Sequence, residues 1–92
     1  MPVAMAKHIL VKTEKEALDI LKKIETDQDF EKCAKRFSIC PSKNKGGDLG
    51  EVRKGDLVKP IETVIFKKAL NKIHGPVKSR FGYHLVKVYF RD

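Results

Sequence analysis

Two strand-like segments near opposite ends of this sequence enclose all of its helical patterns. The first, "VAMAKHILVK" at residues 3–12, is an aliphatic run with polar residues interspersed, and it stops just before a helix-start signal. In the second, "FGYHLVKVYFR" at residues 81–91, every second residue from His84 to Phe90 shares one face, which is the period of a strand. A histidine therefore lies in line with apolar residues in each segment.

Three segments between these strands carry helical periodicity. "TEKE" at residues 13–16 has the form of a capping box and predicts a helix over 14–25. Apolar residues of 30–37 recur at i, i+3, i+4 and i+7, and they predict a second helix with Asp29 as its N-cap. A third helix is predicted over 60–69, where the proline suits the first turn.

Residues 38–59 form a long irregular segment with glycines at positions 46, 47, 50 and 55. We predict a loop there, with a short extended piece over 49–53. Loops longer than about 12 residues in a compact domain are usually functional or disordered. A functional site is therefore expected in this segment.

The stretch "NKIHGPVKS" at residues 71–79 is predicted to turn at Gly75 and Pro76 and to continue as an extended segment over 77–79. We expect His74 to be an exposed turn residue. The resulting order of strand, helix, helix, loop, helix, strand, strand is typical of an α+β domain with helices around a small, largely antiparallel sheet. A chain of 92 residues supports one core, so we predict a single domain over residues 1–92.

The composition and the N-terminal sequence limit the class of protein. With 41% hydrophobic and 35% charged residues, the sequence is that of a soluble globular protein, and it has no apolar run of about 18 residues to span a bilayer. The N-terminus lacks the pattern of a secretory signal peptide, and two cysteines are too few for a disulfide framework. We expect a cytoplasmic monomer that does not contact membranes and whose cysteines are free thiols.

Positive charge is concentrated after the second predicted helix begins. The whole chain has 20 Lys and Arg against 12 Asp and Glu, a net charge of +8, and residues 32–91 hold 15 basic and four acidic residues, a net charge of +11. Such a field attracts polyanions or acidic partners, so weak nucleic-acid binding is one hypothesis. The alternative is a lysine-rich surface that confers solubility.

The stretch "SICPSKNKGGDLG" at residues 38–50 contains glycines, lysines and a thiol, but it matches no nucleotide-binding motif. No Gly-Lys-Ser/Thr follows the glycines, and neither the G-x-G-x-x-G spacing nor a parallel βαβ context is present. A zinc site needs closely spaced ligand pairs, whereas the five Cys and His residues are isolated. We predict neither a metal nor a nucleotide cofactor.

A thiol nucleophile with a histidine base is a further candidate chemistry. Cys40 lies in the long loop, while His8 and His84 lie in the middle of predicted strands, so folding could bring them together. The histidines could equally be core residues whose ring nitrogens are satisfied locally. Cys33 falls on the apolar face of its helix and is predicted to pack there as a small hydrophobic residue.

Three pieces of the sequence, in this order and spacing, resemble the parvulin family of peptidyl-prolyl cis/trans isomerases. They are "HILVK" at 8–12, "FEKCAKRFSICPSKNKGGDLGEVRKGDLVKP" at 30–60, and "GPVKSRFGYHLVKV" at 75–88. The resemblance extends over essentially the whole chain and is to the small, single-domain bacterial or archaeal parvulins. It implies a parvulin-like (FKBP-like) fold, in which helices surround a four-stranded, largely antiparallel sheet whose central strands are the first and the last.

The resemblance also implies a site. His8 and His84 would lie side by side at its floor with Cys40 near them, and Ser79 falls where the family often carries a hydroxyl. Residues expected in the catalytic part are His8, Cys40, Ser79 and His84, and those expected to line the proline pocket are Leu57, Ile61 and Phe81.

The implied activity is isomerisation of X-Pro bonds in peptides and unfolded proteins, without a cofactor. The barrier to this rotation is about 18 to 20 kcal/mol, so catalysis must favour the twisted amide. We expect a non-covalent mechanism, with the proline ring gripped by the apolar pocket and the histidine pair shaping the floor.

Two positions depart from the usual parvulin pattern. Leu57 and Ile61 stand where many members have Met and Phe, so a proline-peptide binding or chaperone-like module with weakened isomerase activity is an alternative, as is a basic nucleic-acid-associated domain. The segment "VKTEKEA" at 11–17 is short and acidic where phosphate-directed members have a basic loop. We therefore predict no preference for phosphoserine before proline.

Overall fold

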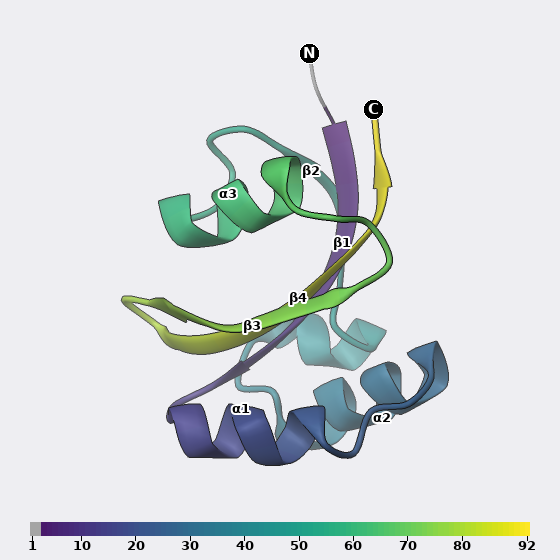
Figure 1. The fold of residues 1–92 in the computed structure, drawn as a ribbon, viewed down its shortest axis with the longest axis vertical. Helices are drawn as coiled ribbons and strands as arrows, with labels where there is room; N and C mark the ends of the chain where they lie inside the picture. Colours follow the sequence, from purple (N-terminus) through teal and green to yellow (C-terminus); the bar gives the residue numbers. More distant parts are fainter. Residues whose placement is uncertain (1–2) are drawn as a thin grey trace.

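The computed structural model describes residues 3–92, and Figure 1 shows how its elements are arranged. In chain order they are β1 (Val3–Val11), α1 (Glu14–Leu21), α2 (Asp27–Phe37), the 3-10 helix η1 (Pro41–Lys45), β2 (Asp48–Arg53), α3 (Lys59–Lys67), β3 (Ile73–Ser79) and β4 (Gly82–Arg91). The strands form one sheet in the order β2-β1-β4-β3, in which every neighbouring pair is antiparallel. The predicted α+β class and the central position of the first and last strands are confirmed. Within residues 3–92, no helix has both the length and the apolar character needed to cross a membrane.

Each face of the sheet is covered by different helices because side chains alternate along β1 and β4. On one face, α3 packs over a core that includes Ala4, Ala6, Ile61, Ile65, Val86 and Val88. On the other face, α1 and α2 pack over a second core that includes Ile9, Val11, Phe30, Ala34 and Leu85. Figure 1 shows α3 separated from α1 and α2 in this way.

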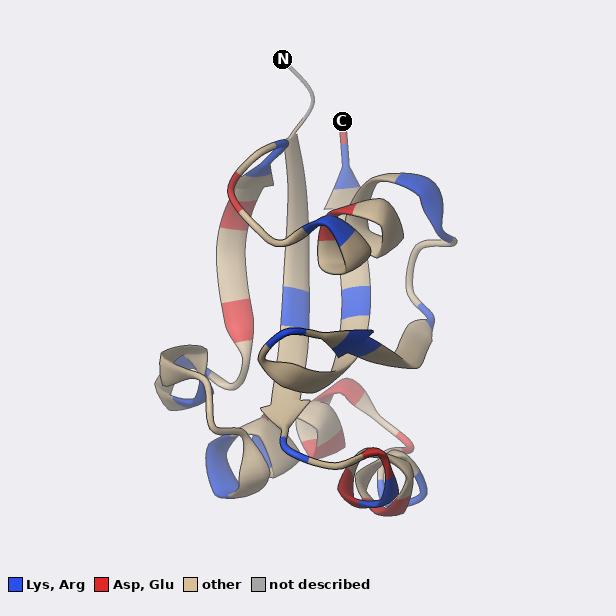
Figure 2. Cartoon of the chain, turned by 90° about the vertical axis from the view of Figure 1, so that its left-hand side faces the viewer, with Lys and Arg blue, Asp and Glu red and all other residues tan. Residues whose placement is uncertain are grey.

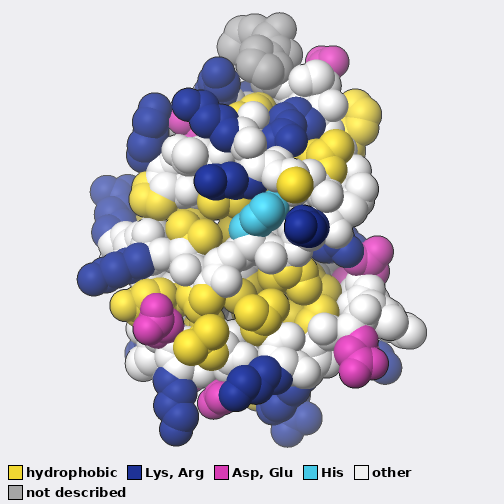
Figure 3. All heavy atoms as spheres, viewed as in Figure 1, with side chains coloured by type: hydrophobic (Ala, Val, Ile, Leu, Met, Phe, Trp, Pro, Cys, Tyr) yellow, Lys and Arg dark blue, Asp and Glu magenta, His cyan; other side chains and the backbone are white. Residues whose placement is uncertain are grey.

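The acidic and basic side chains are distributed differently over the fold. Figure 2 shows the acidic residues gathered mainly on α1, α2 and β2, with basic residues on most elements. On the face shown in Figure 3, Lys and Arg side chains are spread around the surface with hydrophobic side chains exposed between them. The net positive charge of residues 32–91 therefore does not form one continuous patch on this face.

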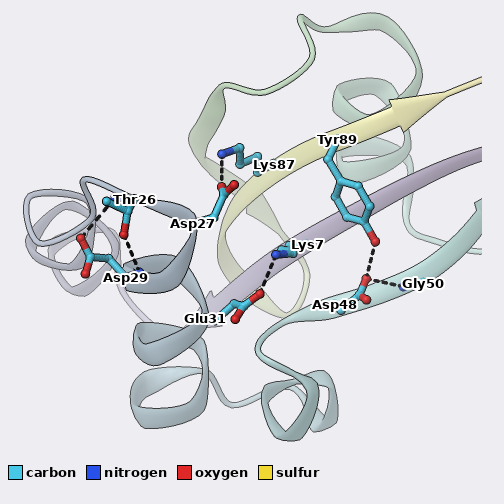
Figure 4. Close-up of polar contacts among 9 residues, drawn as sticks. All are labelled: Lys7, Thr26, Asp27, Asp29, Glu31, Asp48, Gly50, Lys87 and Tyr89. Atoms are coloured by element: carbon cyan, nitrogen blue, oxygen red, sulfur yellow. Dashed lines mark hydrogen bonds and ion pairs between the residues drawn. The ribbon is translucent and has the colours of Figure 1, made fainter.

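Ion pairs join α2 to the sheet face that it covers, as Figure 4 shows. Lys7 Nζ in β1 lies 2.8 Å from Glu31 Oε1, and Lys87 in β4 contacts Asp27 at the start of α2. Both lysines are largely buried, and their charged ends meet carboxylates on the helix. These contacts hold α2 across the two central strands.

The end of the first helix and the start of the second differ from the sequence-based prediction. α1 ends at Leu21 and not at residue 25, since the following N–H groups of Lys23 and Ile24 bond three residues back, which tightens the last turn. The N-cap of α2 is Thr26 and not Asp29. Asp29 is instead the third helical residue of a capping box, in which its carboxylate accepts the Thr26 N–H.

The predicted loop over 38–59 contains the turns of η1 and strand β2, and α3 ends two residues before Ala69. The predicted turn at Gly75 and Pro76 is also wrong, because both residues lie inside β3. Pairing with β4 shifts register between His74 and Val77, so these two residues form an irregularity within the strand. His74 is partly buried in β3, and its Nε2 lies 2.8 Å from the Ala69 carbonyl oxygen.

Candidate active site

A pocket of about 680 Å³ opens on the sheet face that α3 covers. Six of the seven predicted site residues line it, namely His8, Cys40, Leu57, Ile61, Phe81 and His84. The seventh, Ser79, is hydrogen-bonded to the ring of His84. Folding thus gathers segments from residue 8 to residue 84 around a single cavity.

The register of the two central strands brings the histidines together. His84 in β4 is paired with Leu10 in β1, and Leu10 is two residues from His8 on the same face of the strand. The histidines are therefore diagonal neighbours on the face towards α3. Their ring centroids are 5.4 Å apart and their planes are inclined by 22°.

Ser79, His84 and His8 form a chain of side-chain contacts. The Ser79 hydroxyl lies 2.6 Å from His84 Nε2, and His84 Nδ1 lies 3.2 Å from His8 Nδ1. Only one of the two Nδ1 atoms can carry a proton in this contact, so the tautomer of one ring sets that of the other. His8 Nε2, at the end of the chain, is buried without a protein partner in the described part of the structure.

Burial keeps both imidazoles neutral. Removal from water, with a smaller contribution from the neighbouring His84, lowers the pKa of His8 to about 4. Burial also lowers the pKa of His84 below its usual range. The floor of the pocket is therefore uncharged near neutral pH.

The depressed pKa of His8 predicts that the free energy of unfolding falls as the pH decreases from 6.5 to about 4. Above this window His8 is neutral in both states. Within it the unfolded chain binds a proton that the folded chain does not, so unfolding becomes more favourable, by about 3 kcal/mol at the lower end. Urea unfolding at pH 7.5, 6.0, 5.0 and 4.5 measures this slope.

The variant His8→Gln is the control for this dependence. Its slope between pH 6.5 and 5 should be smaller by the part that His8 contributes, while the lowered pKa of His84 maintains the rest. Asp27 and Glu62 have lowered pKa values because of hydrogen bonds to Lys87 and to the Gly55 N–H, so the stability they add is lost at lower pH. An NMR titration in which the His8 ring gains its proton near pH 6.5 would contradict the prediction.

Cys40 stands at one wall of the pocket and is not paired with a histidine. It caps η1, which starts with Pro41, and it is partly exposed. Within residues 3–92, no hydrogen bond joins its thiol to His8 or His84. Cys33, by contrast, is buried on the inner face of α2, where removal from water raises its pKa.

The apolar walls of the pocket come from two other segments. Leu57 lies two residues before α3, and Ile61 lies in the first turn of that helix, where it is buried. Phe81 lies in the turn between β3 and β4, where 54% of its surface is exposed. The guanidinium of Arg80 lies 4.9 Å from the centre of the Phe81 ring. One large aromatic surface is therefore available to a ligand at the mouth of the pocket.

Several residues near the site were not predicted from the sequence. Leu10, Ile39, Leu49 and Arg80 also line the pocket. Leu10 could have been found from its spacing, because it is two residues from His8 in a strand. Ser38 is buried beside the site and accepts the Leu10 N–H at 3.1 Å, a contact across 28 residues that no local pattern signals.

Among residues 3–92, no group of three or more His, Cys, Asp or Glu side chains is placed to hold a metal ion.

Residues 4–89 match the Rotamase family, described as the PPIC-type PPIASE domain. Among curated proteins, the chain is 42% identical over 92 residues to the foldase protein PrsA of Clostridium tetani, covering 99% of this chain and 27% of that protein. It is 46% identical over 85 residues to PrsA of Exiguobacterium sibiricum, covering 90% of this chain and 28% of that protein. The chain thus spans about a quarter to a third of these relatives.

Two solved structures of similar proteins have the same arrangement of strands and helices. The crystal structure of the peptidylprolyl isomerase PrsA from Bacillus anthracis matches with a TM-score of 0.92 and 41% identity, over 99% of this chain and 42% of that one. The solution structure of NmPin, the parvulin of Nitrosopumilus maritimus, matches with a TM-score of 0.83 and 39% identity over 98% of both chains.

Proposed function

The chain belongs to the PPIC-type family and is a parvulin-type peptidyl-prolyl cis/trans isomerase domain, and from this premise we propose that it catalyses X-Pro isomerisation in peptides and unfolded proteins at the pocket on the α3 face. The observation that carries the proposal is the pocket itself, with apolar walls above a floor of two neutral histidines. The name foldase, which the PrsA relatives carry, accords with unfolded chains as substrates.

The proline ring binds between Leu57, Ile61 and Phe81. The three side chains are apolar and line one cavity, and the half-exposed ring of Phe81 loses contact with water when a proline packs on it. Leu and Ile fill two wall positions without an aromatic ring, so Phe81 supplies the flat surface for the proline. Binding of the ring holds one side of the amide while the other side rotates.

The floor favours the twisted amide over the planar one. Twisting removes the resonance that gives the C–N bond its double-bond character and its polarity. A site drier than water opposes the charge separation of the planar amide, and His8 and His84 maintain such a site because they stay neutral. The contact between the rings fixes their tautomers, and neither ring transfers a proton to the substrate.

The enzyme acts on X-Pro bonds without requiring a phosphate before the proline. Only two residues, Lys12 and Thr13, connect β1 to α1, so no basic loop extends from that connection. The charged residues lining the pocket are one cation, Arg80, and one anion, Asp56. A doubly charged phosphate therefore meets no cluster of cations in the pocket.

A protease-coupled assay on a panel of X-Pro peptides tests this function. We expect acceleration of peptides with apolar residues before proline, and no gain when phosphoserine takes that position. If exchange line-broadening showed proline-peptide binding without faster isomerisation, the chain would be a binding module and not an enzyme.

The Cys40→Ser variant is expected to keep kcat/KM within about tenfold of the unchanged protein, because the thiol has no imidazole partner and acts as a wall. The same protease-coupled assay measures it. Near-complete loss of activity in Cys40→Ser at unchanged Tm would instead favour a covalent mechanism. Cys33→Ser is the matched control, since it changes a thiol outside the pocket and tests for loss of stability alone.

Proline-containing chains are favoured over nucleic acid as partners. On the face shown in Figure 3, the basic side chains surround exposed hydrophobic side chains and do not form a continuous track. Weak duplex binding without a steep salt dependence would remove the nucleic-acid function. The cytoplasmic location and the monomeric state stay predictions.

A further inference from the structure

Two serines form the same kind of turn at two places beside the pocket. Each hydroxyl oxygen accepts the N–H of the residue two positions later: Ser38 accepts from Cys40 at 3.3 Å, and Ser79 accepts from Phe81 at 3.1 Å. In both turns the bound N–H belongs to a predicted wall residue of the site. The residues between them, Ile39 and Arg80, are exposed and line the pocket.

Each serine also bonds to one of the two central strands. The Leu10 N–H of β1 donates to Ser38 Oγ at 3.1 Å, and Ser79 Oγ lies 2.6 Å from His84 Nε2 of β4. A single hydroxyl in each turn thus connects a wall residue to a strand that carries a floor histidine. The two serines lie 41 positions apart in the sequence: Ser38 follows the last residue of α2, and Ser79 is the last residue of β3.

The edge of β1 explains why a hydroxyl is needed at Ser38. Pairing of β1 with β2 reaches only Lys7, opposite Asp48, so β2 does not cover the edge of β1 at Leu10. There the Leu10 carbonyl accepts the Ile39 N–H at 2.8 Å, and the Leu10 N–H donates to Ser38. Ser38 is 3% exposed, so water does not replace this acceptor readily.

We propose that Ser38 is a positioning residue of the isomerase site, which holds the Cys40 wall against β1 as Ser79 holds the Phe81 wall against β4. The inference rests on the proposed function, because it assigns these walls to a proline pocket. The two walls are attached independently, and loss of one hydroxyl releases one wall. Substrate binding then weakens because the released wall is displaced, although every side chain of the wall is still present.

Cysteine alkylation tests the attachment at Ser38 without using enzyme activity. In Ser38→Ala we expect iodoacetamide to modify Cys40 about tenfold faster, because loss of a hydrogen bond to a buried N–H favours local opening by roughly that factor. Cys33 is buried on the inner face of α2 and lies in a different tryptic peptide, so mass spectrometry measures its modification separately. The alkylation rate of Cys33 should stay unchanged in Ser38→Ala, because this buried thiol reacts only when the whole domain opens.

Two variants serve as matched controls. Ser42→Ala removes a nearby serine hydroxyl that is buried without a hydrogen-bond partner, so neither thiol should react faster. Ser79→Ala should leave Cys40 alkylation unchanged, because Ser79 bonds to the other wall. Ser79→Ala should raise KM for an X-Pro peptide about tenfold, and Ser79→Thr, which keeps the hydroxyl, should restore it.

Equal acceleration at Cys33 and Cys40 in Ser38→Ala would overturn the inference, since it would mean that Ser38 stabilises only the whole fold. If this variant does not fold, hydrogen exchange of the unchanged protein decides. The Phe81 and Cys40 N–H groups must then exchange at least tenfold more slowly than the Arg80 N–H, and equal rates contradict the two turns. Absence of isomerase activity in the unchanged protein would remove the proposed function, while these exchange and alkylation results would still test the attachment.

Discussion

Replacing Phe81 by alanine is expected to lower kcat/KM for an X-Pro peptide by roughly tenfold to a hundredfold, with little change in the free energy of unfolding. Phe81 is 54% exposed, so folding depends little on it, yet it lines the pocket and its ring is free to pack on proline. Burial of such a side chain contributes about 1.5 to 3 kcal/mol, which corresponds to that range of rates. A protease-coupled assay combined with urea unfolding measures both quantities.

Phe90→Ala is the matched control for this substitution. Phe90 lies near the end of β4, is 50% exposed, and does not line the pocket. Its removal should therefore leave kcat/KM within about twofold, as is usual for surface substitutions away from a site. Equal losses in the two variants would mean that exposed aromatic surface in general, and not the pocket wall, is what the substrate requires.

Replacing Gly47 by alanine is expected to destabilise the fold by about 3 to 5 kcal/mol, which is a large part of the stability of a small domain. Gly47 has φ of +86°, and a Cβ there would lie 2.5 Å from the carbonyl oxygen of His8. Since the neighbour is backbone, it cannot move aside as a flexible side chain can. Gly47 also accepts the His8 N–H at 2.9 Å, so any displacement moves the floor of the site.

Gly50→Ala separates the close contact from the backbone conformation. Gly50 also has a positive φ, +67°, but a Cβ at this position would have no atom within 4 Å. Only the left-handed conformation is then unfavourable, at about 1 to 2 kcal/mol. Urea unfolding of both variants gives the comparison, and a Gly47→Ala protein no less stable than Gly50→Ala would contradict the contact argument.

The fold was largely predictable because its signals are local. The alternation in residues 81–91 and the capping box at 13–16 each depend on neighbours within a few residues. The errors in the predicted elements lie where contacts between residues far apart in the sequence determine the local structure. The turn predicted at Gly75 and Pro76 is part of β3 because β4 pairs with residues on both sides of it. A Cβ at Gly75 would lie 2.4 Å from the His84 carbonyl, so the glycine serves close strand approach.

The residues predicted for the site lie around one pocket or next to it, but residue types alone did not decide its chemistry. Reasoning from residue types alone left Cys40 and the two histidines open between a nucleophilic pair and unrelated residues. The family, which the motif spacing indicated, is confirmed. The roles of individual site residues stay predictions, and the structure bears on them by placing the histidines in contact with each other and the thiol without an imidazole partner.

What the sequence determined by itself is the set of elements, their order and the family, since these depend on periodicity and on motifs read along the chain. Only the tertiary structure decided which groups meet. His84 reaches His8 across 76 positions because of one strand register, and Ser38 reaches Leu10 because β2 ends too early to cover that edge. The strength of such contacts depends on the distance between the groups and on their burial. Both are set only when the strands pair, so they cannot be read along the chain.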